Sequence, residues 1–397
     1  MSELASKIAL LPDLDEFPKG RYTYLDAGSQ HPVGAGAKRA VEQYLQMRHE
    51  EPEVQSFAPT RQAVLEKFAR LVNVSASELS YIQSTTAGEH MILQAMGFPH
   101  SGGHIITDHL HFFGSIPIYE GLERQGVEVT WLPHKEGRIE LDDLKKALRP
   151  DTRLIALSSV STFNGFQHDL KAVCDIAHEA DAWVYADIIH AAGCVPLDLR
   201  DSGVDFAATS SFKWLMGDFG VGFLYVKDSV KQHLHRSQYG YSAIDQMQTH
   251  VYPMDPPGDG VADYAFSQDV AGLFSLGTTN HSVIAQLNYS LDYIQSLGVD
   301  RIQAHAQSLI NVLKHELPAM GYPLLTPLEA PSPMAAFLMP NAKQDLKPIL
   351  DEHRVRISIS NNHFRVSVSV FNTEEEIAQL LSLVPKSHQG VIKRLRS

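Results

Sequence analysis

One segment of the sequence combines a lysine with two flanking aromatic residues and a glycine-rich turn between two apolar runs. Phe212 and Trp214 flank Lys213, and the runs at Asp205–Ala208 and Val221–Val226 are typical of buried strands. Burial lowers the pKa of an ammonium group, and a neutral amine can form a Schiff base with a carbonyl compound. The segment therefore indicates either a catalytic lysine or a lysine whose stem packs along apolar neighbours while its charge reaches water.

Two further groups stand directly after apolar runs. Asp187 follows Ala182–Ala186, where an unpaired buried carboxylate would cost several kcal/mol, so this residue needs a cation or a strong donor unless it only caps a helix. Ser84–Thr86 follows Leu79–Gln83 at a predicted helix start. The hydroxyls, free N–H groups and positive helix end suit a phosphate, although serine and threonine are also ordinary helix caps.

The C-terminal third of the chain adds two arginines and a second hydroxyl-rich turn. Arg356 and Arg365 lie in consecutive short strands, where a guanidinium can hold a substrate carboxylate through two hydrogen bonds or form an internal salt bridge. Gly277–Asn280 resembles the Ser84–Thr86 turn. A metal site is not expected, because the spacing of the nearby histidines matches no zinc signature: His104, His109 and His111. Lysine, buried carboxylate, phosphate turn and arginine together predict pyridoxal 5′-phosphate (PLP) as cofactor.

The elements that must position these groups alternate between strands and helices. Seven apolar runs are predicted as strands: Leu79–Gln83, His104–Thr107, Val127–Leu132, Leu154–Val160, Ala182–Ala186, Asp205–Ala208 and Val221–Val226. Helical patterns between most of them predict an α/β fold with a mostly parallel sheet covered on both faces. We expect a large PLP-binding domain over residues 22–275 and a smaller α+β domain made of residues 1–21 and 276–397. Within the former, Tyr239–Asp269 is too irregular to predict an element.

Composition narrows the class of protein. The 397-residue chain has 33 Lys and Arg against 46 Asp and Glu, and a nucleic-acid-binding surface would need a basic stripe. Cys174 and Cys194 lie in apolar surroundings and are predicted to be buried thiols in a reducing compartment. The N-terminal stretch does not match a signal peptide, and no run approaches the roughly 20 apolar residues of a membrane span. We expect a cytoplasmic protein without nucleic-acid or membrane partners.

In six segments, found in the same order, the sequence resembles the class V aminotransferase family of fold-type I PLP enzymes, which includes cysteine desulfurases, isopenicillin N epimerase and kynureninase. These segments are YLDAGS from Tyr24, STTAG from Ser84, VYADIIHAAG from Val184, SSFKW from Ser210, GTTN from Gly277 and FRVSVSVFNTEEEI from Phe364. The resemblance covers nearly the whole chain. It implies a fold-type I PLP-dependent transferase fold, an amino acid as small-molecule substrate, and a homodimer with shared active sites.

The resemblance also implies a role for each matching residue. Lys213 would hold PLP and move the Cα proton of the substrate, Asp187 would pair with the pyridine nitrogen, and His190 would lie near the phenolic oxygen. The remaining cofactor contacts would come from Thr85, Thr86 and Ser210 at the phosphate, Phe112 stacked on the ring, Thr162 near the cofactor oxygen, and Thr278 of the other subunit. Arg365 would bind the substrate carboxylate, with Arg356 as the alternative.

The reaction is predicted from departures from the family pattern. Cysteine desulfurases of the family carry a reactive cysteine between the strands that hold the two arginines, and the interval Ile357–Phe364 has none. We therefore expect an aminotransferase or a β-eliminating lyase acting on a C–S or C–C bond, and not a persulfide-forming cysteine desulfurase. Two alternatives stay open: a racemase or epimerase like isopenicillin N epimerase, and a PLP-binding protein without catalysis.

Overall fold

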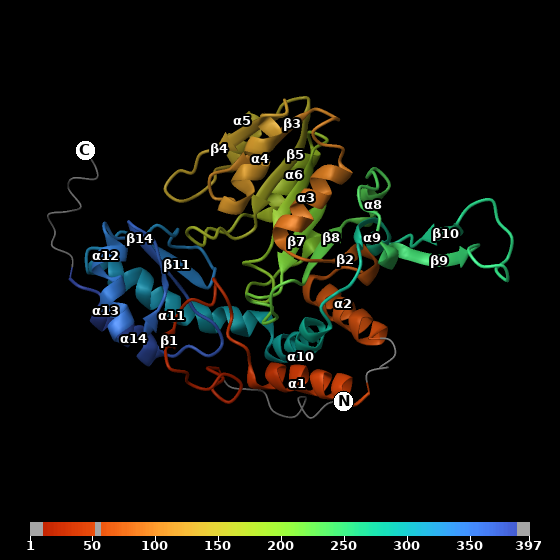
Figure 1. Ribbon diagram of the computed structural model, residues 1–397. Coiled ribbons are helices and arrows are strands. Elements are labelled where there is room, and N and C mark those ends of the chain that lie inside the picture. Colours follow the sequence, from red (N-terminus) through yellow and green to blue (C-terminus); the bar gives the residue numbers. More distant parts are fainter. Residues whose placement is uncertain (1–10, 52–56, 387–397) are drawn as a thin grey trace.

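A seven-stranded sheet forms the centre of the computed structural model, which describes residues 11–51 and 57–386 (Figure 1). Its strands are β2 (Leu79–Ile82), β3 (His104–Asp108), β4 (Glu128–Leu132), β5 (Thr152–Ser158), β6 (Trp183–Asp187), β7 (Phe206–Ser210) and β8 (Gly222–Val226). They lie in the order β2-β8-β7-β6-β5-β3-β4; β8 runs antiparallel to β2 and β7 on either side of it, and the other pairs are parallel. The predicted mostly parallel seven-stranded sheet is confirmed.

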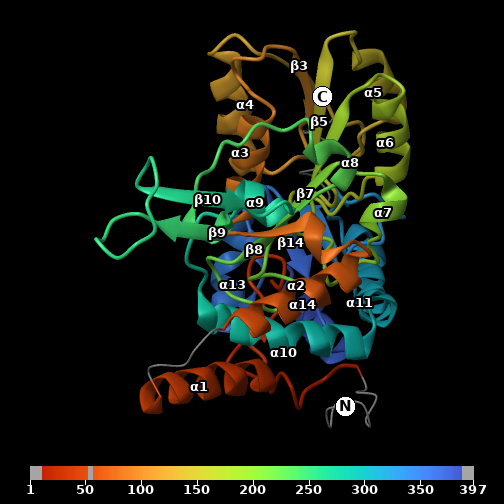
Figure 2. The ribbon, with the colours of Figure 1, turned by 90° about the vertical axis from the view of Figure 1, so that its right-hand side faces the viewer.

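Helices cover both faces of this sheet because its strands are apolar on both sides. Val184 and Ala186 of β6 belong to one buried cluster, whereas Tyr185 between them belongs to the other. One face carries α3 (Thr85–Ala95), α4 (Ile116–Glu123), α8 (Asp228–Lys231) and α9 (Val270–Phe274). The other carries α2 (Ala58–Val72), α5 (Leu141–Ala147), α6 (Leu170–His178), α7 (Leu199–Ser202) and α10 (His281–Leu297), so the sheet lies between two helical layers (Figure 2).

A second core lies beside the first, in the part of the chain that follows α10 (Figure 1). It contains α11 (Val299–Ala319), α12 (Ala342–Asp345), α13 (Lys347–Glu352), α14 (Glu374–Leu383), β11 (Met334–Leu338), β12 (Val355–Arg356), β13 (Ser358–Ile359) and β14 (His363–Ser367). Thr373 caps α14 by accepting a hydrogen bond from the N–H of Glu376, and the Glu376 carboxylate accepts one from the N–H of Thr373.

The N-terminal segment joins this second core. β1 (Thr23–Tyr24) pairs in parallel with β12, and the N–H of Asp13 donates to the Val370 carbonyl. α1 (Ala35–Glu50) instead packs along α10. The domain boundaries expected near residues 21 and 275 stay a prediction. Residues 1–10 and 387–397, which were expected in the small domain, lie outside the described residues, and residues 1–10 are also the start of the stretch compared with a signal peptide.

The prediction that Tyr239–Asp269 forms no regular element is wrong. β9 (Ile244–Thr249) and β10 (Ala262–Phe266) pair antiparallel, and the hairpin projects away from the body of the molecule (Figures 1 and 2). The hairpin escapes sequence analysis because the interior positions of both strands are exposed, so no alternation of apolar and polar residues arises. Its exposed side chains include Met247, Tyr252 and Tyr264.

Candidate active site

Lys213 and His190 meet at the carboxyl edge of the sheet, where β6 and β7 end. Lys213 is only 8% exposed, and its Nζ lies 3.0 Å from His190 Nε2. Burial and the nearby Arg365 charge lower the pKa of Lys213 to about 8. Burial and the charge of Lys213 also hold the pKa of His190 well below its ordinary value. The lysine is therefore buried and not a solvated surface charge, which favours a catalytic lysine among the two interpretations of its segment.

The hydrogen bonds of His190 fix the direction of this contact. Trp214 Nε1–H, which can only donate, lies 3.3 Å from His190 Nδ1. A neutral imidazole that accepts at Nδ1 carries its proton on Nε2. The Nε2–H group then donates to Lys213 Nζ, whose lone pair must be free to accept. This arrangement favours the neutral amine, which is the nucleophilic form of lysine.

Contacts from outside the loop hold Lys213 in place. In α10, Gln286 and Ser290 donate hydrogen bonds to the Met216 carbonyl, at 3.0 and 2.9 Å. Gly193, three residues after His190, has φ +94°, and a Cβ there would lie 2.6 Å from the Trp214 carbonyl oxygen. Only glycine allows this close approach, so the glycine of the VYADIIHAAG segment packs the histidine segment against the lysine loop.

Asp187 is a buried carboxylate at the end of β6. It is 3% exposed, and its Oδ1 accepts a hydrogen bond of 2.9 Å from the N–H of Ile189. Burial raises the pKa of Asp187 to about 6. None of the ion pairs found within residues 11–51 and 57–386 includes this carboxylate. Because a buried carboxylate is costly without a cation, the site fits the protonated pyridine nitrogen of PLP.

The turn before α3 provides donors for an anion. Ser84 caps the helix by accepting a hydrogen bond from the N–H of Ala87, and Ser210 Oγ lies 3.0 Å from Thr85 N and 3.1 Å from Thr85 Oγ1. β7 and α3 therefore meet at this point. Thr86, half-buried in the first turn, adds a hydroxyl to the positive helix end. The donor set fits the phosphate of PLP.

Arg365 connects the two cores of the molecule. The residue lies in β14, is 7% exposed, and donates to the Thr162 carbonyl and, at 2.9 Å, to Thr162 Oγ1. Its second terminal nitrogen donates to Ser29 Oγ at 3.2 Å and lies 3.7 Å from Asp26. The buried Nε has no hydrogen-bond partner among the described residues. A buried guanidinium with an unused donor suits a carboxylate ligand.

Three residues expected at the site are not tied to this group by contacts. Arg356 is exposed on β12. Phe112 is half-buried and contacts Phe113, with 4.5 Å between the ring centroids. Thr278 lines a separate pocket together with Gln83 and Gly220.

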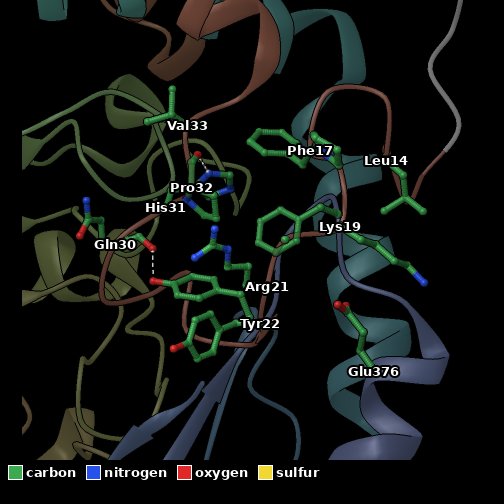
Figure 3. Close-up of a pocket in the computed structure, with 14 residues that line it drawn as sticks. Leu14, Phe17, Lys19, Arg21, Tyr22, Gln30, His31, Pro32, Val33 and Glu376 are labelled. Atoms are coloured by element: carbon green, nitrogen blue, oxygen red, sulfur yellow. Dashed lines mark hydrogen bonds between the residues drawn. The ribbon is translucent and has the colours of Figure 1, made fainter. Parts of the chain in front are cut away.

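A larger pocket, of about 460 Å³, lies beyond Ser29 at the N-terminal segment (Figure 3). Its lining includes Arg21, Tyr24 and Gln30, and the Tyr24 hydroxyl donates to the Gln30 carbonyl at 2.7 Å. Neither Lys213 nor the residues in contact with it line this pocket. The volume of a pocket is therefore a poor guide to the reactive groups of this molecule.

Sequence analysis misses two partners of the central residues. Trp214 is identified only as a flanking aromatic, although its ring N–H sets the tautomer of His190. Ser29 lies in the YLDAGS segment but was assigned no role, and its hydroxyl binds Arg365. The YLDAGS segment could have indicated a role for Ser29, whereas the role of Trp214 is evident only from the orientation of its ring in the structure.

The sequence model of the family described as aminotransferase class-V matches residues 43–380. This chain belongs to that family. PLP is the cofactor of class-V enzymes. This protein is therefore a PLP-dependent enzyme, and its architecture is that of fold type I. When bound, PLP withdraws electrons from Cα of an amino-acid substrate.

Curated relatives match most of this chain, and solved structures share its fold. A cysteine desulfurase IscS of Dictyoglomus turgidum is 24% identical over 95% of this chain and 96% of its own length, and a cysteine desulfurase of Salmonella typhimurium is 25% identical over 82% of each. The cysteine desulfurase CsdA of Escherichia coli has a TM-score of 0.79 at 21% identity, covering 93% of this chain and 95% of its own. The cystine C-S lyase C-DES, in complex with cysteine persulfide, reaches 0.81 at 20% identity over 94% and 98%.

These relatives overturn the predicted reaction. We expected an aminotransferase or β-eliminating lyase that is not a persulfide-forming cysteine desulfurase. This expectation is wrong, because the curated relatives that match this chain over most of their length are cysteine desulfurases. The prediction depended on a single missing cysteine between Arg356 and Arg365. The lysine, aspartate and arginine on which it also relied serve many PLP reactions and do not select one.

The remaining predictions concern cysteines, metals and membranes. Cys174 and Cys194 are buried, and burial raises the pKa of both thiols, to about 12 for Cys174. The ring nitrogens of His104 contact the hydroxyls of Thr152 and Thr130. Within the described ranges, no cluster of three or more His, Cys, Asp or Glu side chains could hold a metal ion, and no helix is long and apolar enough to cross a membrane.

The lowered pKa of Lys213 leads to a pH-dependent prediction. We expect the rate at which cofactor-free protein takes up PLP to rise about tenfold per pH unit below about pH 8 and to level off above it, because only the neutral amine attacks a carbonyl. The rate is measured by stopped-flow absorbance between pH 6 and 10, with Nα-acetyl-lysine in solution as the control. A rate that keeps rising to pH 10, as for the control, would contradict the lowered pKa.

Proposed function

We propose that the protein removes sulfur from cysteine or a closely related α-amino acid in a PLP-dependent reaction. The observation that carries the proposal is the contact of the Lys213 amine with His190 within the same site as Asp187 and Arg365. This arrangement supports a reaction at Cα and Cβ of an α-amino acid. The names of the relatives support sulfur as the substituent on Cβ.

In this reaction we assign the following roles to the residues of the chain. Arg365 binds the α-carboxylate and thereby orients the substrate. Lys213 removes and returns the proton at Cα, while the Nε2–H of His190 holds its amine in place. Asp187 would hold the pyridine nitrogen protonated, and the turn at Thr85 and Thr86, with Ser210 and Thr162, would hold the rest of the cofactor. Phe112 would contact its ring.

The thiol that accepts the sulfur is proposed to come from another molecule. Nucleophilic attack needs an exposed thiolate. Cys174 and Cys194, the two cysteines of the sequence, are each 1% exposed and have raised thiol pKa values. A small thiol or a partner protein would therefore take up the sulfur.

We further propose a cytoplasmic homodimer in which Thr278 completes the site of the partner. Its position in a pocket apart from Lys213 supports this arrangement, as does the exposed apolar surface of the β9–β10 hairpin. Sedimentation equilibrium should give twice the mass of one chain, and a monomer that binds PLP and turns over normally would contradict it.

A product assay tests the proposed reaction. The enzyme is incubated with L-cysteine and L-cystine, with and without dithiothreitol, and alanine, pyruvate, ammonia and sulfide are quantified. We expect alanine from L-cysteine, with sulfide that appears only when the added thiol is present. Turnover of sulfur-free amino acids in the absence of any sulfur release would overturn the proposal, and a keto acid that requires an acceptor keto acid would indicate transamination instead.

A further inference from the structure

A buried carboxylate next to the active site has no role in the mechanism described so far. Glu89 lies in α3, one turn beyond Thr86, and is 3% exposed. Its Oε1 accepts a hydrogen bond of 2.5 Å from the Tyr119 hydroxyl and lies 3.0 Å from His111 Nε2. Its Oε2 accepts one of 2.6 Å from Ser115. Every side chain of this cluster is buried.

Glu89 and His111 lie at ion-pair distance, 3.0 Å, and the pKa of each is shifted toward its charged form. Burial alone would raise the pKa of Glu89, but the His111 charge and the three hydrogen bonds bring it below its ordinary value. Burial alone would lower the pKa of His111, but Glu89 and the other carboxylates that face it, Asp108 and Asp187, raise it. Replacing such a buried pair by apolar groups of similar volume often leaves stability unchanged or higher, so stability alone is a weak reason for it.

The other end of the pair reaches the strand beside Asp187. His111 Nδ1 lies 2.9 Å from Ser158 Oγ, and Ser158 of β5 stands opposite Asp187 of β6 in the sheet register. Burial raises the pKa of Asp187, and the Ile189 N–H and the nearby His111 charge oppose this effect. The cluster therefore connects α3 and α4 to the residue expected to hold the pyridine nitrogen.

We propose that Glu89 and His111 are a positioning pair that keeps Asp187 ionised for the cofactor. Glu89 holds His111 as an imidazolium, and His111 offsets part of the cost of the buried negative charge on Asp187. The pair acts through Asp187 and does not touch the substrate. This inference rests on the proposed role of Asp187.

The test compares three variants with the intact enzyme. Glu89→Gln removes the charge and keeps the shape of the side chain, and the double variant Glu89→Gln/His111→Gln removes both charges without leaving one unpaired. His178→Gln is the matched control, because His178 Nε2 lies 2.9 Å from the buried Asp205 carboxylate before β7. The dissociation constant of PLP and the absorbance spectrum of the bound cofactor are measured from pH 6 to pH 9, together with the melting temperature.

We expect Glu89→Gln to weaken PLP binding about fivefold at pH 6 and less than about twofold at pH 9, because loss of the imidazolium raises the pKa of Asp187 and so depletes the ionised carboxylate only near and below that pKa. The double variant should show the same pH-dependent loss, since Glu89 acts through His111. The control should keep the wild-type dissociation constant. A fall in melting temperature with unchanged PLP binding and an unchanged spectrum would make the pair purely structural and overturn the inference.

The variant Asp187→Asn tests the proposed role of Asp187 separately from that of the Glu89–His111 pair. This variant should bind PLP weakly at every pH and show an altered spectrum. If it instead binds PLP as the wild type does, the proposed role of Asp187 fails. If Asp187→Asn loses PLP while Glu89→Gln does not, only the role of the Glu89–His111 pair fails.

Discussion

The Lys213→Ala enzyme is expected to lose turnover on the order of 10⁴-fold or more, because one side chain both holds the cofactor and moves the Cα proton. Borohydride treatment of the wild type should leave PLP covalently attached to the peptide that contains Lys213, and the variant should release all of its cofactor on denaturation. Turnover is measured with the sulfur-release assay, and attachment by mass spectrometry of tryptic peptides.

Two other lysines provide controls for this experiment. Lys38 is exposed on α1 and pairs with Glu42, so Lys38→Ala should keep full turnover. Lys314 is buried like Lys213, but its ammonium donates hydrogen bonds to the Leu328 and Ala330 carbonyls. A charged lysine bound to two carbonyls is not a nucleophile, so we expect no PLP on Lys314. A Lys213→Ala enzyme with normal turnover would remove the assigned role.

Replacing Arg365 by alanine is expected to raise KM for the amino acid by about 30-fold to several thousand-fold, with a smaller change in kcat. Losing one partner of a buried charge-assisted pair costs about 2–5 kcal/mol, and about 1.4 kcal/mol corresponds to a factor of ten. The KM of Arg365→Lys should fall between the values for Arg365→Ala and the wild type, because lysine keeps the charge but loses the bidentate geometry. Steady-state kinetics on the substrate and on its carboxamide provide the measurement.

The carboxamide distinguishes substrate binding from damage to the fold. The wild type should prefer the free acid strongly, and Arg365→Ala should lose this preference, whereas a general loss of packing would lower the rates for both compounds alike. Arg356→Ala is the matched control, since Arg356 is exposed on β12. If Arg356→Ala raises KM and Arg365→Ala does not, the carboxylate is bound by Arg356.

The central sheet could be predicted because its strands are short and apolar on both faces. The run expected at Ala182–Ala186 forms β6 at Trp183–Asp187, a shift of one residue. The same logic failed for β9, whose interior side chains are exposed and therefore follow no pattern that burial would impose. Sequence periodicity reports contact with a core, and the hairpin has little such contact.

Within the site, residue type identified Lys213, Asp187 and Arg365, but not the contacts that determine their chemistry. The His190 tautomer depends on the orientation of the Trp214 ring, which no spacing in the sequence fixes. Glu89 sits in a helix among ordinary polar residues, and its three donors come from positions 22 to 30 residues later in the chain. The reaction could not be derived either, since the same three residues serve several reactions at Cα and Cβ.

The position of β2 at the edge of the sheet has a consequence for biosynthesis. Among the strands of residues 11–51 and 57–386, β2 pairs only with β8, and roughly 140 residues of chain separate the two, so their pairing closes a long loop. A nascent chain on the ribosome has no partner for β2 until residue 226 has emerged. The anion-binding turn that follows β2 is therefore assembled only after more than half of the 397-residue polypeptide has been synthesised, and the vitamin-derived cofactor cannot be captured before then.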